Sequence, residues 1–73
     1  MKLNFKVNEK YILLDILKRI PKNFLNQKEV EFETIDQSNM LIIKVYYKNV
    51  FQFEVKLITS KGLCEIVEIK WNT

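Results

Sequence analysis

The stretch MLIIKVYYKNVFQFEVKLIT, residues 40–59, decides the fold, because its pattern is that of two strands joined by a short turn. Apolar and polar side chains alternate along the second half, which is the period of a strand with one buried face, while the first half is a β-branched and aromatic run with Lys44 as its charged residue. Lys48, Asn49 and Val50 separate the halves with turn-type residues at hairpin length. We therefore expect an antiparallel hairpin of residues 40–47 and 51–59.

Two more strand-like segments flank this hairpin, at residues 29–35 and 63–71. The separators, residues 36–39 and 60–62, are short and rich in turn-type residues. Connections of this length force antiparallel neighbours, so the sequence predicts a four-stranded meander.

The N-terminal part of the chain predicts a strand followed by one helix. Leu3, Phe5 and Val7 alternate with polar residues over the first seven positions. Asn8 can cap a helix whose apolar residues recur at helical spacing over residues 9–19, and Pro21 ends it. The expected fold class is α+β, β-α-β-β-β-β, with an antiparallel meander sheet packed on one helix. With 73 residues, the chain allows one small domain over residues 1–73.

Pairing of like with like predicts the register of the meander. A four-residue first turn sets Phe32 opposite Ile43, and a three-residue second turn sets Val45 opposite Phe53. Lys44 then lies between glutamates of the neighbouring strands. The face expected to pack on the helix carries Phe32, Ile43, Val45, Tyr47, Phe51, Phe53, Val55, Leu57, Val67, Ile69 and Trp71.

The reverse face is predicted to be polar except for an apolar group at one end. Large exposed apolar patches commonly mark interfaces, so this group predicts binding of a protein partner or formation of a homodimer. The expected group comprises Met40, Ile42, Ile58 and Ile66, with Cys64 beside them.

Catalysis is disfavoured, because the chain has no histidine, one glycine, and no nucleophile or phosphate-loop motif. Glu29, Glu31 and Glu33 share a strand face and could hold a hard cation, yet alternating carboxylates are usually a solvated face. Cys64 lacks a histidine to activate it and is expected to be a small buried residue. We expect a non-enzymatic protein without cofactor or metal.

Nucleic-acid binding is the alternative function. Lysines interleaved with an aromatic side chain resemble in type the platform of a single-strand binder. The modest net charge of +3 and the glutamates among the lysines argue against it. The residues of this alternative are Lys44, Tyr46, Lys48, Lys56 and Lys70.

The order of the segments DILKRI (residues 15–20), NVFQFEVKLI (residues 49–58) and LCEIVEIKW (residues 63–71) resembles the helix and meander of the kinase-associated C-terminal domains. Such domains fold as compact α+β modules and bind membranes or kinase domains. This sequence lacks the C-terminal helix of that pattern and adds a strand before the helix. No site residue or function is carried over from the resemblance.

Cysteine usage and hydropathy bear on the compartment. A lone cysteine, the absence of a signal-peptide pattern and the shortness of every apolar run predict a cytoplasmic protein, in the host cell if viral, with no membrane span. Lysine far outnumbers arginine and alanine is absent, a usage that favours AT-rich codons. Our hypothesis is an accessory or inhibitory factor of a phage or mobile element, which docks on its partner through the sheet.

Overall fold

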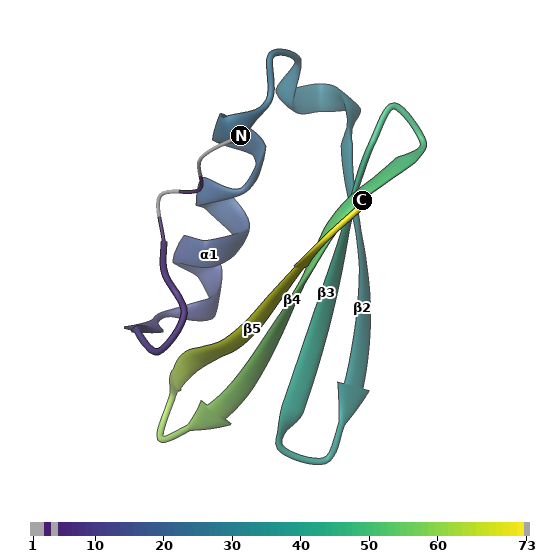
Figure 1. The fold of residues 1–73 in the computed structure, drawn as a ribbon. Coiled ribbons are helices and arrows are strands. Elements are labelled where there is room, and N and C mark those ends of the chain that lie inside the picture. The colour runs from purple at the N-terminus through teal and green to yellow at the C-terminus, as the bar shows by residue number, and fades with distance from the viewer. Residues whose placement is uncertain (1–2, 4, 73) are drawn as a thin grey trace.

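Four long strands form the meander that the alternating pattern predicts, and the computed structural model describes them within residues 3 and 5–72. The strands are β2 (Val30–Gln37), β3 (Met40–Tyr47), β4 (Val50–Ser60) and β5 (Leu63–Trp71) (Figure 1). A two-residue strand, β1 (Lys10–Tyr11), joins the far side of β5, which gives a five-stranded sheet in the order β1-β5-β4-β3-β2. Every neighbouring pair is antiparallel, so the predicted α+β class with a meander sheet is confirmed.

The three hairpins of the meander turn over two residues each, at residues 38–39, 48–49 and 61–62. In the last of them Lys61 has φ 52° and Gly62 has φ 81°. Positive φ at both central residues is the requirement of a type I′ turn, whose twist matches that of the flanking strands. The turns are therefore tighter than the three- and four-residue separators that the sequence predicts.

The tight first turn shifts the predicted register between β2 and β3 by two residues. Phe32 faces Val45 instead of Ile43, and Glu33 takes the place of Glu31 opposite Lys44. An even shift keeps every side chain on its predicted face, because side chains alternate with a period of two. The predicted pairing partners were wrong, while the predicted faces of β2 are retained.

A bulge in β4 separates a correct part of the predicted register from an incorrect one. Val45 faces Phe53, as predicted, but Tyr46 faces Phe51, so that Gln52 is the extra residue. Phe51 consequently lies on the same face as Tyr46, and their rings meet edge to face at 5.7 Å between centroids. The prediction that Phe51 belongs to the core face was wrong.

The N-terminal residues contribute to the core without forming the predicted strand. Residues 1, 2 and 4 lie outside the described part of the chain, but Phe5 is in a bend and Val7 in a turn. The first strand instead lies at β1, where Asn8 (φ 72°) donates its amide to the Ile66 carbonyl at 2.7 Å. Asn8 therefore turns the chain into the sheet and does not cap the helix.

Helix α1 (Leu13–Arg19) begins four residues later than predicted, because the preceding residues belong to β1. Ile12 is its extended N-cap, without a side-chain hydrogen bond. The helix ends before the 3₁₀-helix η1 (Pro21–Asn23), and a second 3₁₀-helix, η2 (Gln27–Glu29), leads into β2.

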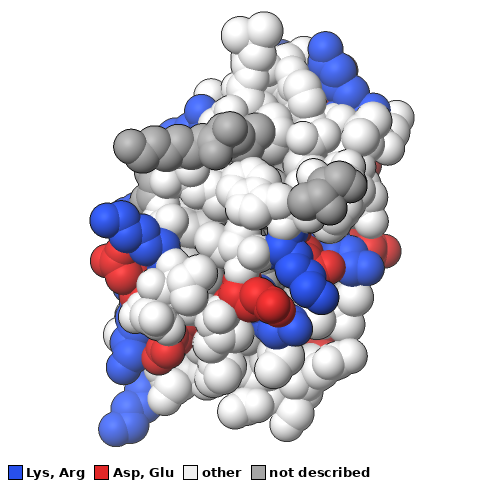
Figure 2. Space-filling model, in the orientation of Figure 1, with Lys and Arg blue, Asp and Glu red and all other residues white. Residues whose placement is uncertain are grey.

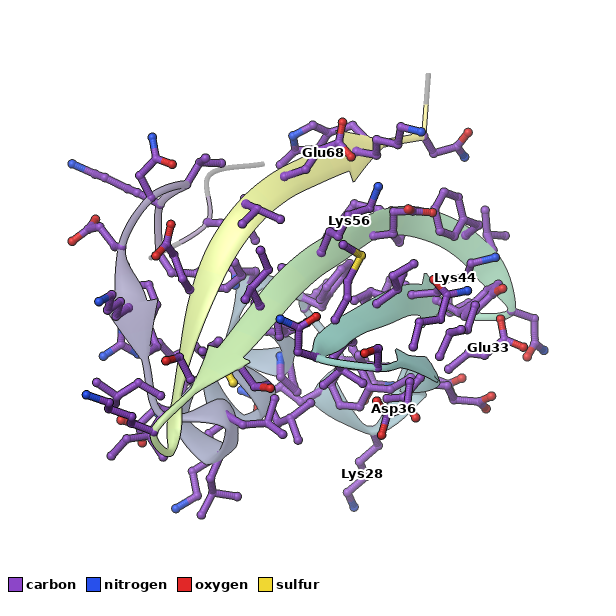
Figure 3. All side chains as sticks on the ribbon, turned by 90° about the horizontal axis from the view of Figure 1, so that it is seen from below. Lys28, Glu33, Asp36, Lys44, Lys56 and Glu68 are labelled. Atoms are coloured by element: carbon purple, nitrogen blue, oxygen red, sulfur yellow. The ribbon has the colours of Figure 1, made fainter. Side chains whose placement is uncertain are left out.

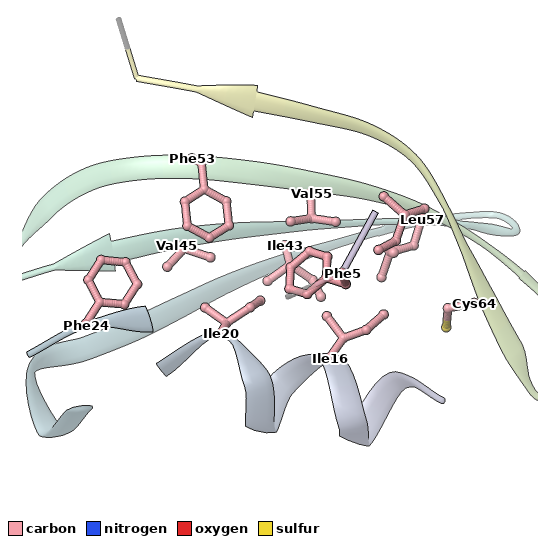
Figure 4. Close-up of a cluster of buried hydrophobic side chains, with 11 residues drawn as sticks. Phe5, Ile16, Ile20, Phe24, Ile43, Val45, Phe53, Val55, Leu57 and Cys64 are labelled. Atoms are coloured by element: carbon pink, nitrogen blue, oxygen red, sulfur yellow. The ribbon is translucent and has the colours of Figure 1, made fainter. Parts of the chain in front are cut away.

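The hydrophobic core lies between α1 and one face of the sheet (Figure 4). Ile16 and Ile20 extend from the helix side and are fully buried, and Phe24 stacks on Tyr47 at 4.8 Å between ring centroids. The helix therefore covers this face and leaves the opposite face of the sheet without a helix among the described residues. The buried cluster comprises Phe5, Ile16, Ile20, Phe24, Ile43, Val45, Phe53, Val55, Leu57, Cys64 and Ile66.

Candidate interaction surface

The face of the sheet opposite α1, here called the outer face, is organised in rows of cross-strand neighbours. Side chains opposite one another on adjacent strands share a face and lie close enough to interact. Figure 3 shows Glu33, Lys44, Lys56 and Glu68 coming from four successive strands of this face. The rows are Glu31, Tyr46 and Phe51; then Glu33, Lys44, Glu54 and Lys70; then Ile35, Ile42, Lys56 and Glu68; and finally Gln37, Met40, Ile58 and Glu65.

The second of these rows alternates in charge across the four long strands, and Glu33 is its end on the edge strand β2. The Tyr46 hydroxyl donates a hydrogen bond to Glu33 Oε1 at 3.2 Å. Loss of solvent around the phenol, followed by the charge and the hydrogen bond of Glu33, raises the pKa of Tyr46 above its ordinary value. Tyr46 therefore stays protonated and can keep donating to the carboxylate.

The third row contains an ion pair between Lys56 on β4 and Glu68 on β5. Lys56 Nζ lies 3.0 Å from Glu68 Oε1, and both side chains are partly exposed. The hydrogen bond from Lys56, aided by its positive charge, lowers the pKa of Glu68 below the ordinary glutamate value. The pair fixes two long side chains over the middle of the outer face.

An apolar corner lies at the end of the outer face that is farthest from the row of Glu31, Tyr46 and Phe51. We define it as Ile35, Met40, Ile42 and Ile58, all half-buried in strands β2 to β4. Ile35 pairs with Ile42 and Met40 pairs with Ile58, so the four side chains are contiguous. Ile35 is a residue that the sequence reasoning missed, although it lies two positions after Glu33 and so had to share its face.

Ile66, the fourth residue predicted for this group, lies on the other side of the sheet. It is fully buried in the core, and so is nearly all of Cys64. The cause is a second bulge: Lys56 faces Glu68 but Leu57 faces Ile66, which leaves Val67 as the extra residue. Because of this bulge, the side chains of β5 before Val67 lie on the opposite face from the predicted one. The placement of Ile66 and Cys64 on the reverse face was therefore wrong.

Burial has a chemical consequence for Cys64, which is a free thiol. Loss of solvent raises its pKa above the ordinary thiol value. The thiol is the unreactive form, so this site does not favour a nucleophile.

Four of the five residues predicted for nucleic-acid binding share the outer face, namely Lys44, Tyr46, Lys56 and Lys70. Lys48 lies in the turn between β3 and β4, with its Nζ 5.4 Å from the centroid of the Tyr47 ring. The lysines of the outer face all have glutamates as cross-strand neighbours. On the side of the molecule seen in Figure 2, basic and acidic side chains are also interspersed.

The predicted carboxylate trio is divided between two elements. Glu29 ends η2, whereas Glu31 and Glu33 lie on β2. In the described part of the chain, no group of three or more acidic, cysteine or histidine side chains is arranged to hold a metal ion.

The outer face is hollowed where β2 meets β3. An open hollow of about 340 Å³ is lined by Glu31, Phe32, Glu33, Tyr46 and Asn49. It combines the carboxylates of Glu31 and Glu33 with the ring and hydroxyl of Tyr46, whereas the side chain of Phe32, which alternates with the two glutamates along β2, belongs to the core face. Such a lining suits a long cationic side chain, whose stem can lie along the ring of Tyr46 while its head meets the carboxylates.

Comparisons with known proteins add no relative: no family model, no curated protein and no solved structure matches this chain. Over residues 3 and 5–72, none of the helices has the length and apolar character needed to cross a bilayer.

Proposed function

We propose that this protein is a non-enzymatic interaction module that docks on another protein through the outer face of its sheet. The observation that carries the proposal is the apolar corner, Ile35, Met40, Ile42 and Ile58, on the face that α1 does not cover. Protein interfaces combine an apolar centre with a polar rim, and the charged rows supply such a rim. An origin in a phage or mobile element, and an intracellular setting in which Cys64 stays reduced, belong to this proposal.

The experiment compares two strand variants as bait for proteins of the native host, with mass spectrometry to identify what is retained. Ile42→Thr removes apolar surface from the corner while keeping a β-branched residue. Val50→Thr is the matched control, because Val50 is 55% exposed at the start of β4, away from the corner. We expect Ile42→Thr to lose a partner that wild type and Val50→Thr retain. Equal retention by all three would contradict docking through the corner.

Self-association through the same face is tested in solution. If a second copy covers the corner, light scattering should show a dimer for wild type and a monomer for Ile42→Thr. A monomeric wild type that still retains a partner assigns the corner to a different protein.

Nucleic acid is the second candidate, favoured by the gathering of Lys44, Tyr46, Lys56 and Lys70 on one face. Binding through lysines should weaken steeply with salt. A chain that fails to retain single-stranded DNA or RNA even at low ionic strength would remove this candidate.

A further inference from the structure

The two edges of the sheet differ in how much backbone they leave open. On one side, β1 pairs with β5 at Cys64 and Glu65. Ile66 extends this cover, since its backbone exchanges hydrogen bonds with Asn8 and Glu9. On the other side, all eight residues of β2 (Val30–Gln37) pair only with β3 among the described strands. A strand edge of this length is a ready template for another extended chain.

Natural edges are usually blunted by charged side chains, lysine above all, by proline or by a bulge, and β2 has no lysine, proline or bulge. Its pairing with β3 runs without interruption from Val30 to Gln37. It carries instead the carboxylates Glu31, Glu33 and Asp36 and no basic residue, although the net charge of the chain is +3. The edge of β2 therefore leaves backbone groups available for another strand, and its negative charge favours a strand with basic side chains.

That charge argues against a second copy as the occupant of the edge. Pairing two β2 strands would bring the three carboxylates of each copy onto one ladder, and like charges across a strand pair are destabilising. A strand with basic side chains gains from the same carboxylates.

The rows of the outer face specify the order of side chains in such a strand. The charged row runs Lys70, Glu54, Lys44 and Glu33, so a cation would continue its alternation beyond β2. The next positions along β2 are Glu31 on one side and Ile35 on the other. In antiparallel pairing, a matching segment therefore presents an apolar residue opposite Ile35 and then two cations at alternate positions.

The hollow beside the edge provides space for one of these cations. Glu31, Phe32, Glu33 and Tyr46 contribute to its lining, and the hydrogen bond from Tyr46 to Glu33 fixes one carboxylate in place. A lysine or arginine from the added strand would lie against the ring of Tyr46 and reach both carboxylates.

We propose that a basic, extended segment of a partner protein pairs with the open edge of β2 and extends the five-stranded sheet. The inference rests on the proposed function and names the chemistry of its partner. The apolar residue of the segment continues the apolar corner at Ile35, so edge and corner form one docking surface.

The test uses peptides of defined sequence and the full chain. The probe is TITKTKT, blocked at both ends, and its charge-reversed counterpart is TITETET. Titration followed by amide NMR should show at least tenfold tighter binding of the lysine peptide, with shifts concentrated on β2 and a strong dependence on salt. Equal affinity of the two peptides, or no binding of either, would overturn the proposal.

Backbone pairing is tested separately with two lysine peptides that are N-methylated at alternate residues. In a paired strand, alternate N–H groups point toward and away from the edge of the neighbouring strand. One of the two methylated peptides should therefore lose binding at least tenfold and the other should retain it. Similar affinities for both would show that the carboxylates attract the peptide without strand pairing.

Side-chain selectivity is tested with the double variant Glu31→Gln and Glu33→Gln, which keeps size and removes charge. Its control is the double variant Glu9→Gln and Asp15→Asn, which removes equal charge from exposed residues away from β2. The first should reduce the preference for the lysine peptide to less than threefold, while the control keeps it. A preference that survives in both variants would assign the peptide to another surface.

Failure of this inference can be told from failure of the proposed function. If Ile42→Thr loses a host partner but the peptides show no selectivity, the corner docks a protein and the edge does not. If the peptides behave as expected but all baits retain the same proteins, the edge binds basic strands and docking through the corner is wrong. A wild-type dimer that binds no lysine peptide, and whose amide shifts on β2 mark the contact between the copies, would assign the edge to a second copy and overturn the inference.

Discussion

At the scale of single residues, the reactivity of Cys64 reports which face of the sheet the first half of β5 presents to the core. Its side chain is 3% exposed in the core, and burial raises its pKa. Because only the accessible thiolate reacts quickly, we expect alkylation in the folded protein to be at least 100-fold slower than in urea at about pH 8. Mass spectrometry of iodoacetamide-treated samples measures both rates. Labelling at equal rates would contradict the placement of Cys64 in the core.

The ion pair between Lys56 and Glu68 predicts a pH dependence of stability. The pKa of Glu68 is lower in the folded protein than its ordinary value of 4.5, so the pair stabilises the fold above that value. This contribution is lost as the pH falls through the lowered pKa. Lys56→Gln should therefore reduce the urea midpoint at neutral pH, and the difference from wild type should shrink steadily as the pH falls below 4.5.

The control for this prediction is Lys28→Gln, an exposed lysine in η2 that removes the same charge. Its midpoint should follow that of wild type as the pH falls. A constant deficit of Lys56→Gln across the pH range would assign the effect to its aliphatic stem and not to the ion pair.

At the scale of elements, the turn between β4 and β5 contains a residue in an unfavourable conformation. Lys61 has φ 52°, which L-residues adopt at a cost and which asparagine tolerates better. Lys61→Asn also creates Asn-Gly, the preferred pair for a type I′ turn. We expect a gain in the free energy of unfolding of roughly 0.5–1 kcal/mol, measured by urea denaturation.

The matched variants for the turn are Lys61→Val and Lys28→Asn. Valine is branched at Cβ and should destabilise the turn, whereas the change at Lys28 should bring no gain. An equal gain from both asparagine variants would trace the effect to charge and not to the left-handed backbone.

The elements also show where sequence reasoning succeeded and where it failed. Runs rich in β-branched and aromatic residues between turn-type residues are typical of strands, so residues 40–47 and 63–71 were predicted with the bounds of β3 and β5. The length of the first turn was not predictable in this way, because Asp36 and Gln37 are turn-type residues that nevertheless pair with β3. At these two residues, pairing across a two-residue hairpin outweighs the local preference for a turn.

Bulges explain the remaining errors in the sheet. Gln52 and Val67 are each an extra residue, and nothing in an alternating pattern marks which residue of a strand is skipped. Each bulge exchanges the faces on its two sides. Met40, Ile42 and Ile58 stay together because they lie on the side of Gln52 where the pairing of β3 with β4 is as predicted, whereas the bulge at Val67 moves Ile66 into the core.

At the scale of the whole molecule, stability depends on a core that one short helix completes. Ile16 is fully buried, whereas Leu14 on the same helix is 57% exposed. Ile16→Ala should cost about 2–5 kcal/mol, a large share of the stability of a domain this small. Leu14→Ala should change it by less than about 0.5 kcal/mol. Urea denaturation followed by Trp71 fluorescence measures both, and similar losses would contradict the orientation of α1.

The pairing of β1 with β5 also has a consequence for how the chain folds during synthesis. Residues 10–11 leave the ribosome before their partners Cys64 and Glu65, which follow more than fifty residues later along the chain. The helix side of the nascent protein therefore stays incomplete while β2, β3 and β4 emerge and pair as local hairpins. Until β5 is made, Phe5 and Ile16 lack the part of their apolar cover that Cys64 and Ile66 supply in the folded chain.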